Sequence, residues 1–133
     1  MWKKAKMVVL VLVVVGALII VLYFTVRHWL FKKEVEFTEH ILQQTKQALQ
    51  VYKIEYGTYP EPTNWCYVLM HPQGSNVTRG IVYLYTGPDR APPTDAWGYV
   101  LEYRRQSNGF KVISVGPDGK MGSSDDVHAV VDE

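Results

Sequence analysis

The chain has 133 residues, enough for one small domain once its apolar N-terminal segment is set aside. Six of its 14 Lys and Arg residues precede residue 34, so residues 34–133 hold the other 8 and all 13 Asp and Glu residues, about −5 in net charge. This part has no basic patch or basic helix, which excludes nucleic acid as an expected partner. The single cysteine, Cys66, excludes an intrachain disulfide.

The chain opens with an uncharged apolar run at residues 7–26, which reads MVVLVLVVVGALIIVLYFTV. At a helical rise of about 1.5 Å per residue it spans roughly 30 Å, the thickness of the hydrocarbon layer of a membrane. The run has no polar face, and the remaining residues are too few to wrap it as a buried core helix. We therefore predict a single-pass transmembrane helix at 7–26, behind a short basic N-terminus at 1–6.

A cleaved signal peptide is the alternative for this segment. Signal peptides have a shorter apolar region, roughly 7–15 residues, that ends at a small-x-small site. Here the longer run leads into aromatic residues and a lysine pair, Tyr23, Phe24, Trp29, Phe31, Lys32 and Lys33. This pattern is typical of a membrane exit, so an uncleaved anchor with an interfacial segment at 27–33 is favoured. Three basic residues lie on each side of the span, which leaves its orientation undecided.

A second helical stretch is predicted over residues 34–55. Apolar and small residues recur there at steps of three and four, forming one stripe: Phe37, Ile41, Leu42, Thr45, Ala48, Leu49 and Tyr52. No Pro or Gly lies between Gly16 and Gly57. We therefore expect one continuous helix of about 50 residues that ends at Gly57, with Pro60 close behind.

The C-terminal half reads as loops followed by a small sheet. Six prolines make residues 58–98 irregular, with a short helix at 64–70, a short strand or turn at 81–85 and a glycosylation sequon at 76–78. Two β-rich runs, 99–104 and 110–115, flank an Asn-Gly pair within residues 106–109 that favours a tight hairpin. A third strand is expected at 127–131. The fold class is therefore α+β, with residues 34–133 as the soluble domain.

The loop between the last two strands, residues 115–126, concentrates oxygen-bearing side chains. It reads VGPDGKMGSSDD and holds three carboxylates, Asp118, Asp125 and Asp126. Calcium takes six to eight oxygen ligands, and glycines let a backbone curl to present them. The same residue types are ordinary in a solvated turn, so composition leaves both interpretations open.

The sequence does not favour an enzyme. It contains no phosphate-binding Gly loop, no HExxH and no Gly-x-Ser-x-Gly elbow. Cys66 has no evident catalytic partner, and His40, His71 and His128 are expected to be surface or satisfied histidines.

Several segments together resemble one family. Residues 49–60, LQVYKIEYGTYP, resemble the end of the long helix in type IV pilin-like proteins, where Gly-x-Tyr-Pro follows. The ordered segments at 95–98 (DAWG), 103–104 (YR), 114–119 (SVGPDG) and 125–126 (DD) resemble the G-type major pseudopilin of type II secretion. The resemblance covers about residues 40–131.

The resemblance implies a pilin-like fold, in which the long N-terminal helix packs on a small C-terminal antiparallel sheet. It also implies a calcium site in the C-terminal loop. Carried over by position, the ligands are the carboxylates of Asp118, Asp125 and Asp126, the carbonyl of Val115, and a backbone or hydroxyl oxygen of Ser123. Asp95, Trp97 and Gly98 are expected to be structural, fixing the start of the sheet.

The N-terminus departs from the family pattern. Pseudopilins carry a short basic leader that ends in Gly, where prepilin peptidase cuts, and a Glu at the fifth mature position. Here Gly16 lies in the middle of the apolar run and no Glu lies within it.

Taken together, these features predict a non-catalytic pseudopilin-like structural protein of a type II secretion or type IV pilus-like machine. It is expected to be anchored in the bacterial inner membrane, with its domain in the periplasm. The expected partners are the membrane, other pseudopilins or secretion-machine components, and further copies in a homo-oligomer or filament. The alternative is a membrane-anchored periplasmic binding or adaptor module that reuses the pilin fold.

Overall fold

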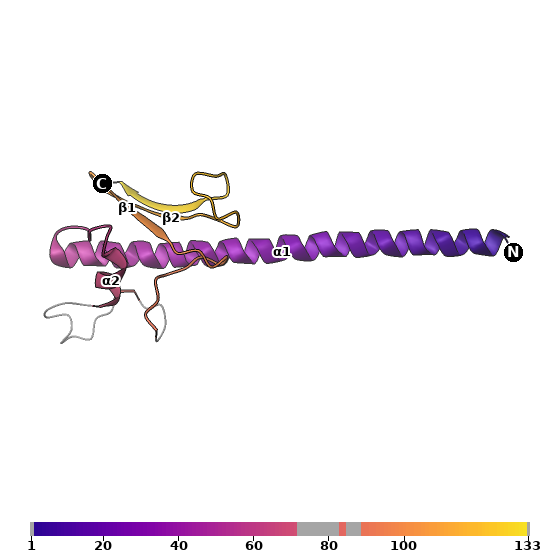
Figure 1. Ribbon diagram of the computed structural model, residues 1–133, viewed down its shortest axis with the longest axis horizontal. Coiled ribbons are helices and arrows are strands. Elements are labelled where there is room, and N and C mark those ends of the chain that lie inside the picture. Colours follow the sequence, from indigo (N-terminus) through magenta and orange to yellow (C-terminus); the bar gives the residue numbers. More distant parts are fainter. Residues whose placement is uncertain (1, 72–82, 85–88, 133) are drawn as a thin grey trace. The chain divides into compact units, whose positions relative to one another are not determined.

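The computed structural model describes residues 2–71, 83–84 and 89–132. Its elements in chain order are α1 (Trp2–Tyr56), α2 (Trp65–Met70), β1 (Glu102–Gln106), β2 (Gly109–Ser114) and β3 (Val127–Asp132) (Figure 1). The chain divides into two compact units, Met1–Glu34 and Val35–Glu133.

The described residues of the first unit, 2–34, are all helical. α1 has 55 residues, which confirms the prediction of one continuous helix, and it begins at Trp2, within the short basic N-terminus. Helix Lys4–Tyr56 is long and apolar enough to cross a membrane, with a mean hydropathy of 3.2 in its most apolar window. The hydroxyl of Thr25 donates to the carbonyl of Val21 at 2.8 Å, so its polar group is satisfied within the helix.

In the second unit, the C-terminal part of α1 buries one face. The buried residues are Thr38, Leu42, Thr45, Ala48 and Leu49, with Ile41 and Tyr52 partly buried. The predicted stripe is therefore correct except at its first member, since Phe37 is 50% exposed. Thr38 takes the buried place instead, because its hydroxyl oxygen accepts the backbone N–H of Ala96 at 3.2 Å.

The end of α1 follows the predicted pattern. Gly57 has φ +76° and donates its N–H to the carbonyl of Lys53 at 2.7 Å. A left-handed residue directly after the last turn is the usual way for a helix to end, and glycine adopts it without a steric cost.

The segment after α1 is partly described. The predicted short helix is confirmed as α2, with Asn64 at its N-terminal boundary. The sequon at 76–78 and most of the expected strand or turn at 81–85 lie outside the described residues. Tyr83 and Leu84 belong to no strand, and both donate backbone N–H groups to the carbonyl of Leu69 at 3.2 Å.

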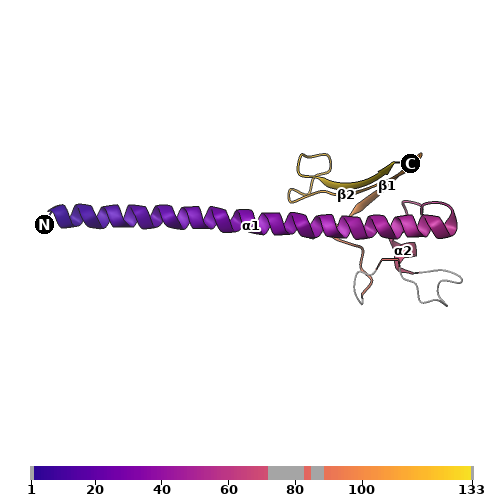
Figure 2. The same cartoon turned by 180° about the vertical axis from the view of Figure 1, so that it is seen from behind.

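The sheet has three antiparallel strands in the order β1-β2-β3 and lies along one side of the C-terminal part of α1 (Figures 1 and 2). The expected hairpin is confirmed, but its turn is Ser107-Asn108, because Gln106 pairs with Gly109 and Gly109 begins β2. β1 begins at Glu102 and not at residue 99, since the preceding residues pair back with 93–95. Thr94 forms a bridge with Val100, and Leu101 donates to the carbonyl of Pro93 at 3.0 Å.

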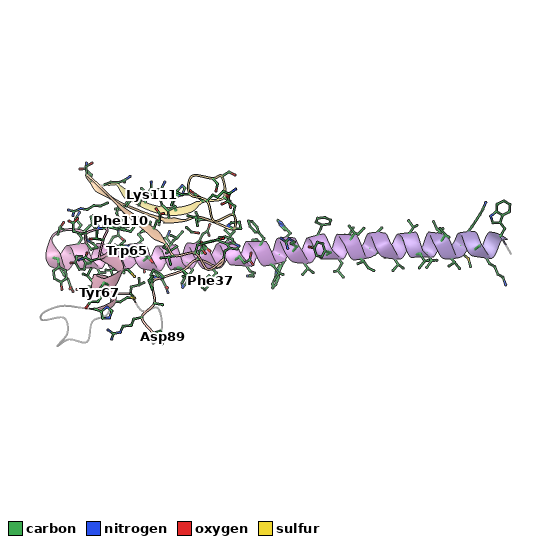
Figure 3. All side chains as sticks on the ribbon, viewed as in Figure 1. Phe37, Trp65, Tyr67, Asp89, Phe110 and Lys111 are labelled. Carbon is green, nitrogen blue, oxygen red and sulfur yellow. The ribbon has the colours of Figure 1, made fainter. Side chains whose placement is uncertain are left out.

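The core of the second unit joins α1, α2 and the sheet. Phe110 is fully buried, with its ring centroid 4.8 Å from that of Tyr59, and Figure 3 shows it on the α1 side of the sheet with Lys111 on the other side. Tyr103 packs on Trp65 at 5.5 Å and donates its hydroxyl to the carbonyl of Pro60 at 3.0 Å. Tyr59 and Pro60 of the Gly-Thr-Tyr-Pro segment after α1 are therefore buried, whereas Gly57 and Thr58 are exposed.

Candidate metal centre

The candidate site is the loop of residues 115–126, which joins β2 to β3. These strands are neighbours in the sheet, so the two ends of the loop are held close together. Two glycines allow its tight course. A Cβ atom on Gly116 would lie 2.5 Å from the carbonyl oxygen of Asp125, and one on Gly119 would lie 2.6 Å from the ring of Tyr99. Both glycines have φ +66°, a conformation that other residues rarely adopt.

Backbone N–H groups orient the three carboxylates of the loop. Asp118 donates its N–H to Oδ2 of Asp125 at 3.2 Å, and Lys120 donates to Oδ1 of Asp118 at 2.8 Å. Gly122 donates to Oδ2 of Asp126 at 2.8 Å. Each carboxylate therefore has one oxygen fixed by the loop's own backbone.

The hydroxyl of Ser123 lies where the carboxylates converge. Its Oγ is 3.3 Å from Oδ1 of Asp118 and 3.3 Å from Oδ1 of Asp126, and it also contacts Oδ1 of Asp125. A hydroxyl donates one proton, so it cannot satisfy three anionic acceptors together. The remaining negative charge makes this point of the loop attractive to a cation.

The electrostatics of Asp125 agree with a charged loop. The hydrogen bond from Ser123 lowers the pKa of its carboxyl, and it outweighs the opposing effect of desolvation with help from backbone N–H groups and the charge of Lys120. Asp125 is therefore ionised at neutral pH, as a metal ligand must be.

The loop brings together four of the five predicted ligands, Asp118, Ser123, Asp125 and Asp126. The fifth, Val115, opens the loop directly before Gly116 with its side chain buried. Among the described residues, no three His, Cys, Asp or Glu side chains form by themselves a group that could hold a metal ion. The donor set is nevertheless all oxygen, and calcium completes its shell with carbonyls, hydroxyls and water. The donor atoms of the loop are therefore of the type that calcium prefers.

Comparison with known proteins gives the family. The family model described as type II secretion system (T2SS), protein G, matches residues 29–133. The chain belongs to this family. Type II secretion system core protein G of Escherichia coli (strain K12) is 30% identical over 89 residues, covering 62% of this chain and 57% of that protein. The chain thus spans somewhat more than half the length of this curated relative. No solved structure gives a significant match.

This family is that of the major pseudopilins, whose motifs the sequence resembles. In this chain, the Asp-x-Trp-Gly segment at residues 95–98 lies beside the loop of residues 115–126. Asp95 is 4% exposed, and its carboxylate accepts the N–H groups of Trp97 at 3.0 Å and Tyr99 at 2.9 Å. It also accepts the hydroxyl of Ser114 at 2.6 Å. Asp95 therefore fixes the turn that precedes the sheet. Sequence reasoning missed the role of the two polar residues that complete this arrangement, Ser114 and Thr38. Ser114 is a hydroxyl within the apolar run of residues 112–115, whereas Thr38 lies between Phe37 and Glu39 without such a signal.

The residues that an enzyme could use have ordinary structural environments. Burial raises the pKa of the Cys66 thiol, which disfavours the thiolate that a nucleophile needs. The Nδ1 of His71 lies 3.0 Å from the carbonyl of Tyr67, one turn earlier. His40 pairs with Gln44 at 3.0 Å on the same helix.

Proposed function

We propose that this chain is a non-catalytic, membrane-anchored structural protein of a type II secretion or type IV pilus-like machine. The observation that carries this proposal is the family match over residues 29–133, in a chain whose helix Lys4–Tyr56 is apolar enough to cross a membrane. The span would lie in the bacterial inner membrane and the folded domain in the periplasm. Its expected partners are the membrane and other components of the machine.

Calcium is the second part of the proposal. The carboxylates of Asp118, Asp125 and Asp126 would hold the ion, with the carbonyl of Val115 and an oxygen of Ser123 in the same shell. In support, the three carboxylates share the single proton of the Ser123 hydroxyl. A divalent cation supplies the positive charge that this cluster lacks. The loop itself joins β2 to β3, and its hydrogen bonds give it a defined conformation in which the carboxylates can hold the ion.

A calcium titration tests this part. The full chain in detergent micelles is unfolded by heat in EDTA and in rising free calcium, beside the double variant Asp125→Asn/Asp126→Asn. Linkage predicts that calcium stabilises the wild type by about 2.7 kcal/mol at about 100 times its Kd. The double variant, which keeps the side-chain shapes, should gain little. Ser124→Ala is the matched control, because Ser124 is exposed in the same loop. Equal shifts in all three proteins, or none, would contradict calcium binding here.

The proposed role within the machine is that of an anchored accessory and not a polymerised subunit. In support, the apolar run at 7–26 contains no Glu, the residue that the resembled pattern places near the mature N-terminus. Mass spectrometry of the protein from native membranes separates the two roles. An unprocessed, unmethylated N-terminus supports the accessory, whereas cleavage and methylation point to a filament subunit.

The absence of Glu from the apolar run also favours one alternative function. In this alternative, the chain is a membrane-anchored binding or adaptor module that reuses the pilin fold. Affinity purification of the full chain from native membranes distinguishes it. Recovery of secretion-machine components supports the first function, and their absence, beside a reproducible unrelated partner, supports the adaptor.

A further inference from the structure

We propose that Asp95 is a positioning residue for the loop of residues 115–126. It lies outside the ligand set and acts through the hydroxyl of Ser114, which holds the backbone of Gly116 at the start of the loop. The inference rests on the proposed calcium function for its effect on affinity. Its effect on the loop's conformation does not require the ion.

The hydrogen bonds have a defined direction. The hydroxyl of Ser114 is 2.6 Å from Oδ2 of Asp95, and it has one proton to donate. A carboxylate accepts only, so the proton points to Asp95 and a lone pair of the hydroxyl points elsewhere. That lone pair accepts the N–H of Gly116 at 3.2 Å. Asp95 and Ser114 are both buried, so water does not replace either bond.

Gly116 in turn fixes the far end of the loop. A Cβ atom at this glycine would lie 2.5 Å from the carbonyl oxygen of Asp125 and 2.8 Å from its Oδ2. The two backbones are therefore in contact across the loop. A displacement of Gly116 changes the space available to Asp125, one of the proposed ligands.

The same carboxylate holds the loop at a second point. Oδ1 of Asp95 accepts the N–H groups of Trp97 and Tyr99. The ring of Tyr99 then packs on Gly119, where a Cβ atom would lie 2.6 Å from it. One buried side chain thus positions two glycines of the loop, Gly116 by hydrogen bonds and Gly119 by contact. The turn is also tied to α1 through Ala96 and Thr38.

This arrangement predicts a preorganised loop. A loop that is already fixed loses less conformational entropy when an ion binds, so its affinity is higher. Residues that orient metal ligands without touching the metal typically change affinity by roughly 10–100-fold when substituted. We expect a loss of that size for Asp95→Asn, because a neutral amide accepts hydrogen bonds more weakly and its nitrogen cannot accept one from Ser114.

The test measures two quantities on the full chain in detergent micelles. Calorimetric titration well below the unfolding temperature gives the calcium Kd, and hydrogen exchange in EDTA gives the protection of the loop amides. Asp95→Asn and Ser114→Ala should each weaken calcium binding at least about 10-fold and speed exchange across 115–126. Val112→Ala is the control for general destabilisation, because Val112 is fully buried in β2 and takes no part in these bonds. It should lower the unfolding temperature while the Kd stays near the wild-type value.

The test distinguishes a failure of the positioning role of Asp95 from a failure of the proposed calcium binding. Wild-type affinity and wild-type exchange in both Asp95→Asn and Ser114→Ala would overturn the inference. An absence of calcium binding in the wild type would defeat the proposed calcium function, and the exchange in EDTA would still decide whether Asp95 positions the loop. If Asp95→Asn does not fold, Ser114→Ala decides, because it removes the bond to Gly116 and leaves those from Trp97 and Tyr99.

Discussion

Tyr103 connects the sheet to the segment after α1 and has an unusual environment for a phenol. Its ring packs on Trp65 and Phe110, and its hydroxyl donates to the carbonyl of Pro60 at 3.0 Å. Burial, opposed in part by the charge of Arg105, raises the pKa of Tyr103 to about 12. The folded protein therefore holds this phenol neutral at a pH where an unfolded chain would ionise it.

Tyr103→Phe should flatten the alkaline limb of the stability profile. A group whose folded pKa lies above its unfolded value contributes stability that is complete below about pH 10 and lost as the pH rises towards about 12. Denaturant unfolding from pH 8 to pH 11.5 should show a smaller loss for the variant than for the wild type. At neutral pH the variant should lose about 1–3 kcal/mol, since the buried carbonyl of Pro60 is left without its donor. The exposed Tyr67→Phe is the control, and parallel curves for Tyr103→Phe and wild type would contradict the assignment.

At the residue scale, hydrophobicity alone predicts the core incompletely. Phe37 was assigned to the buried stripe on its hydrophobicity and is half exposed, whereas Thr38 is fully buried. The reason is a hydrogen bond to Ala96, 58 residues away, which local periodicity does not contain. The proposed acidic ligands follow from the loop's composition and the resemblance, and they stay a prediction. The position of Ser123 among them depends on how the loop closes.

The loop between β2 and β3 shows how glycines permit an element that its other residues alone would not form. Gly116 and Gly122 both have positive φ, but their surroundings differ. A Cβ atom at Gly116 would meet the backbone of Asp125, whereas one at Gly122 would meet nothing within 4 Å. Comparing substitutions at Gly116 and Gly122 therefore separates two costs. One is the cost of a positive φ, and the other is the cost of a Cβ atom against the backbone of Asp125.

Gly116→Ala should destabilise the protein more than Gly122→Ala. A left-handed conformation costs a non-glycine residue about 1–2 kcal/mol, and Gly122→Ala should lose about that amount. Gly116→Ala adds an approach of 2.5 Å to a carbonyl oxygen, which the loop can relieve only by shifting its backbone. Unfolding by denaturant in EDTA measures both variants without any contribution from an ion. Equal losses would mean that the loop moves aside at no cost.

The sequence pattern predicted which segments are helices and which are strands, but it did not predict where each of them begins and ends. The continuous helix, the short α2, the hairpin and the last strand were predicted from periodicity and turn residues. β1 starts three residues later than its β-rich run because Asp95 and Thr94 draw residues 99–100 into a turn. The Asn-Gly pair marked the hairpin correctly, yet Ser107 and Asn108 form its turn. In both places the backbone pairing that forms, Thr94 with Val100 and Gln106 with Gly109, sets the boundary in place of the β-propensity of the single residues.

For the whole molecule, basic residues alone do not set the orientation of the proposed membrane span. The apolar side chains of residues 7–26 lie exposed on α1, as expected of a helix whose solvent is lipid. Three basic residues before the span and three after it give no orientation by charge, and the acidic residues of the domain contribute little to that rule. Family membership is therefore the argument for a periplasmic domain, and direct labelling must decide.

Single-cysteine variants allow that measurement because Cys66 is the chain's one cysteine. In a Cys66→Ala background, Asn108→Cys places a thiol in the exposed β1–β2 turn, and Trp2→Cys places one at the start of α1, where Trp2 is 78% exposed. We expect a membrane-impermeant maleimide to label Asn108→Cys in cells with a permeabilised outer membrane. Trp2→Cys should react only after the inner membrane is opened. The reverse order would place the domain in the cytoplasm, and labelling of both thiols before opening would show that α1 does not cross.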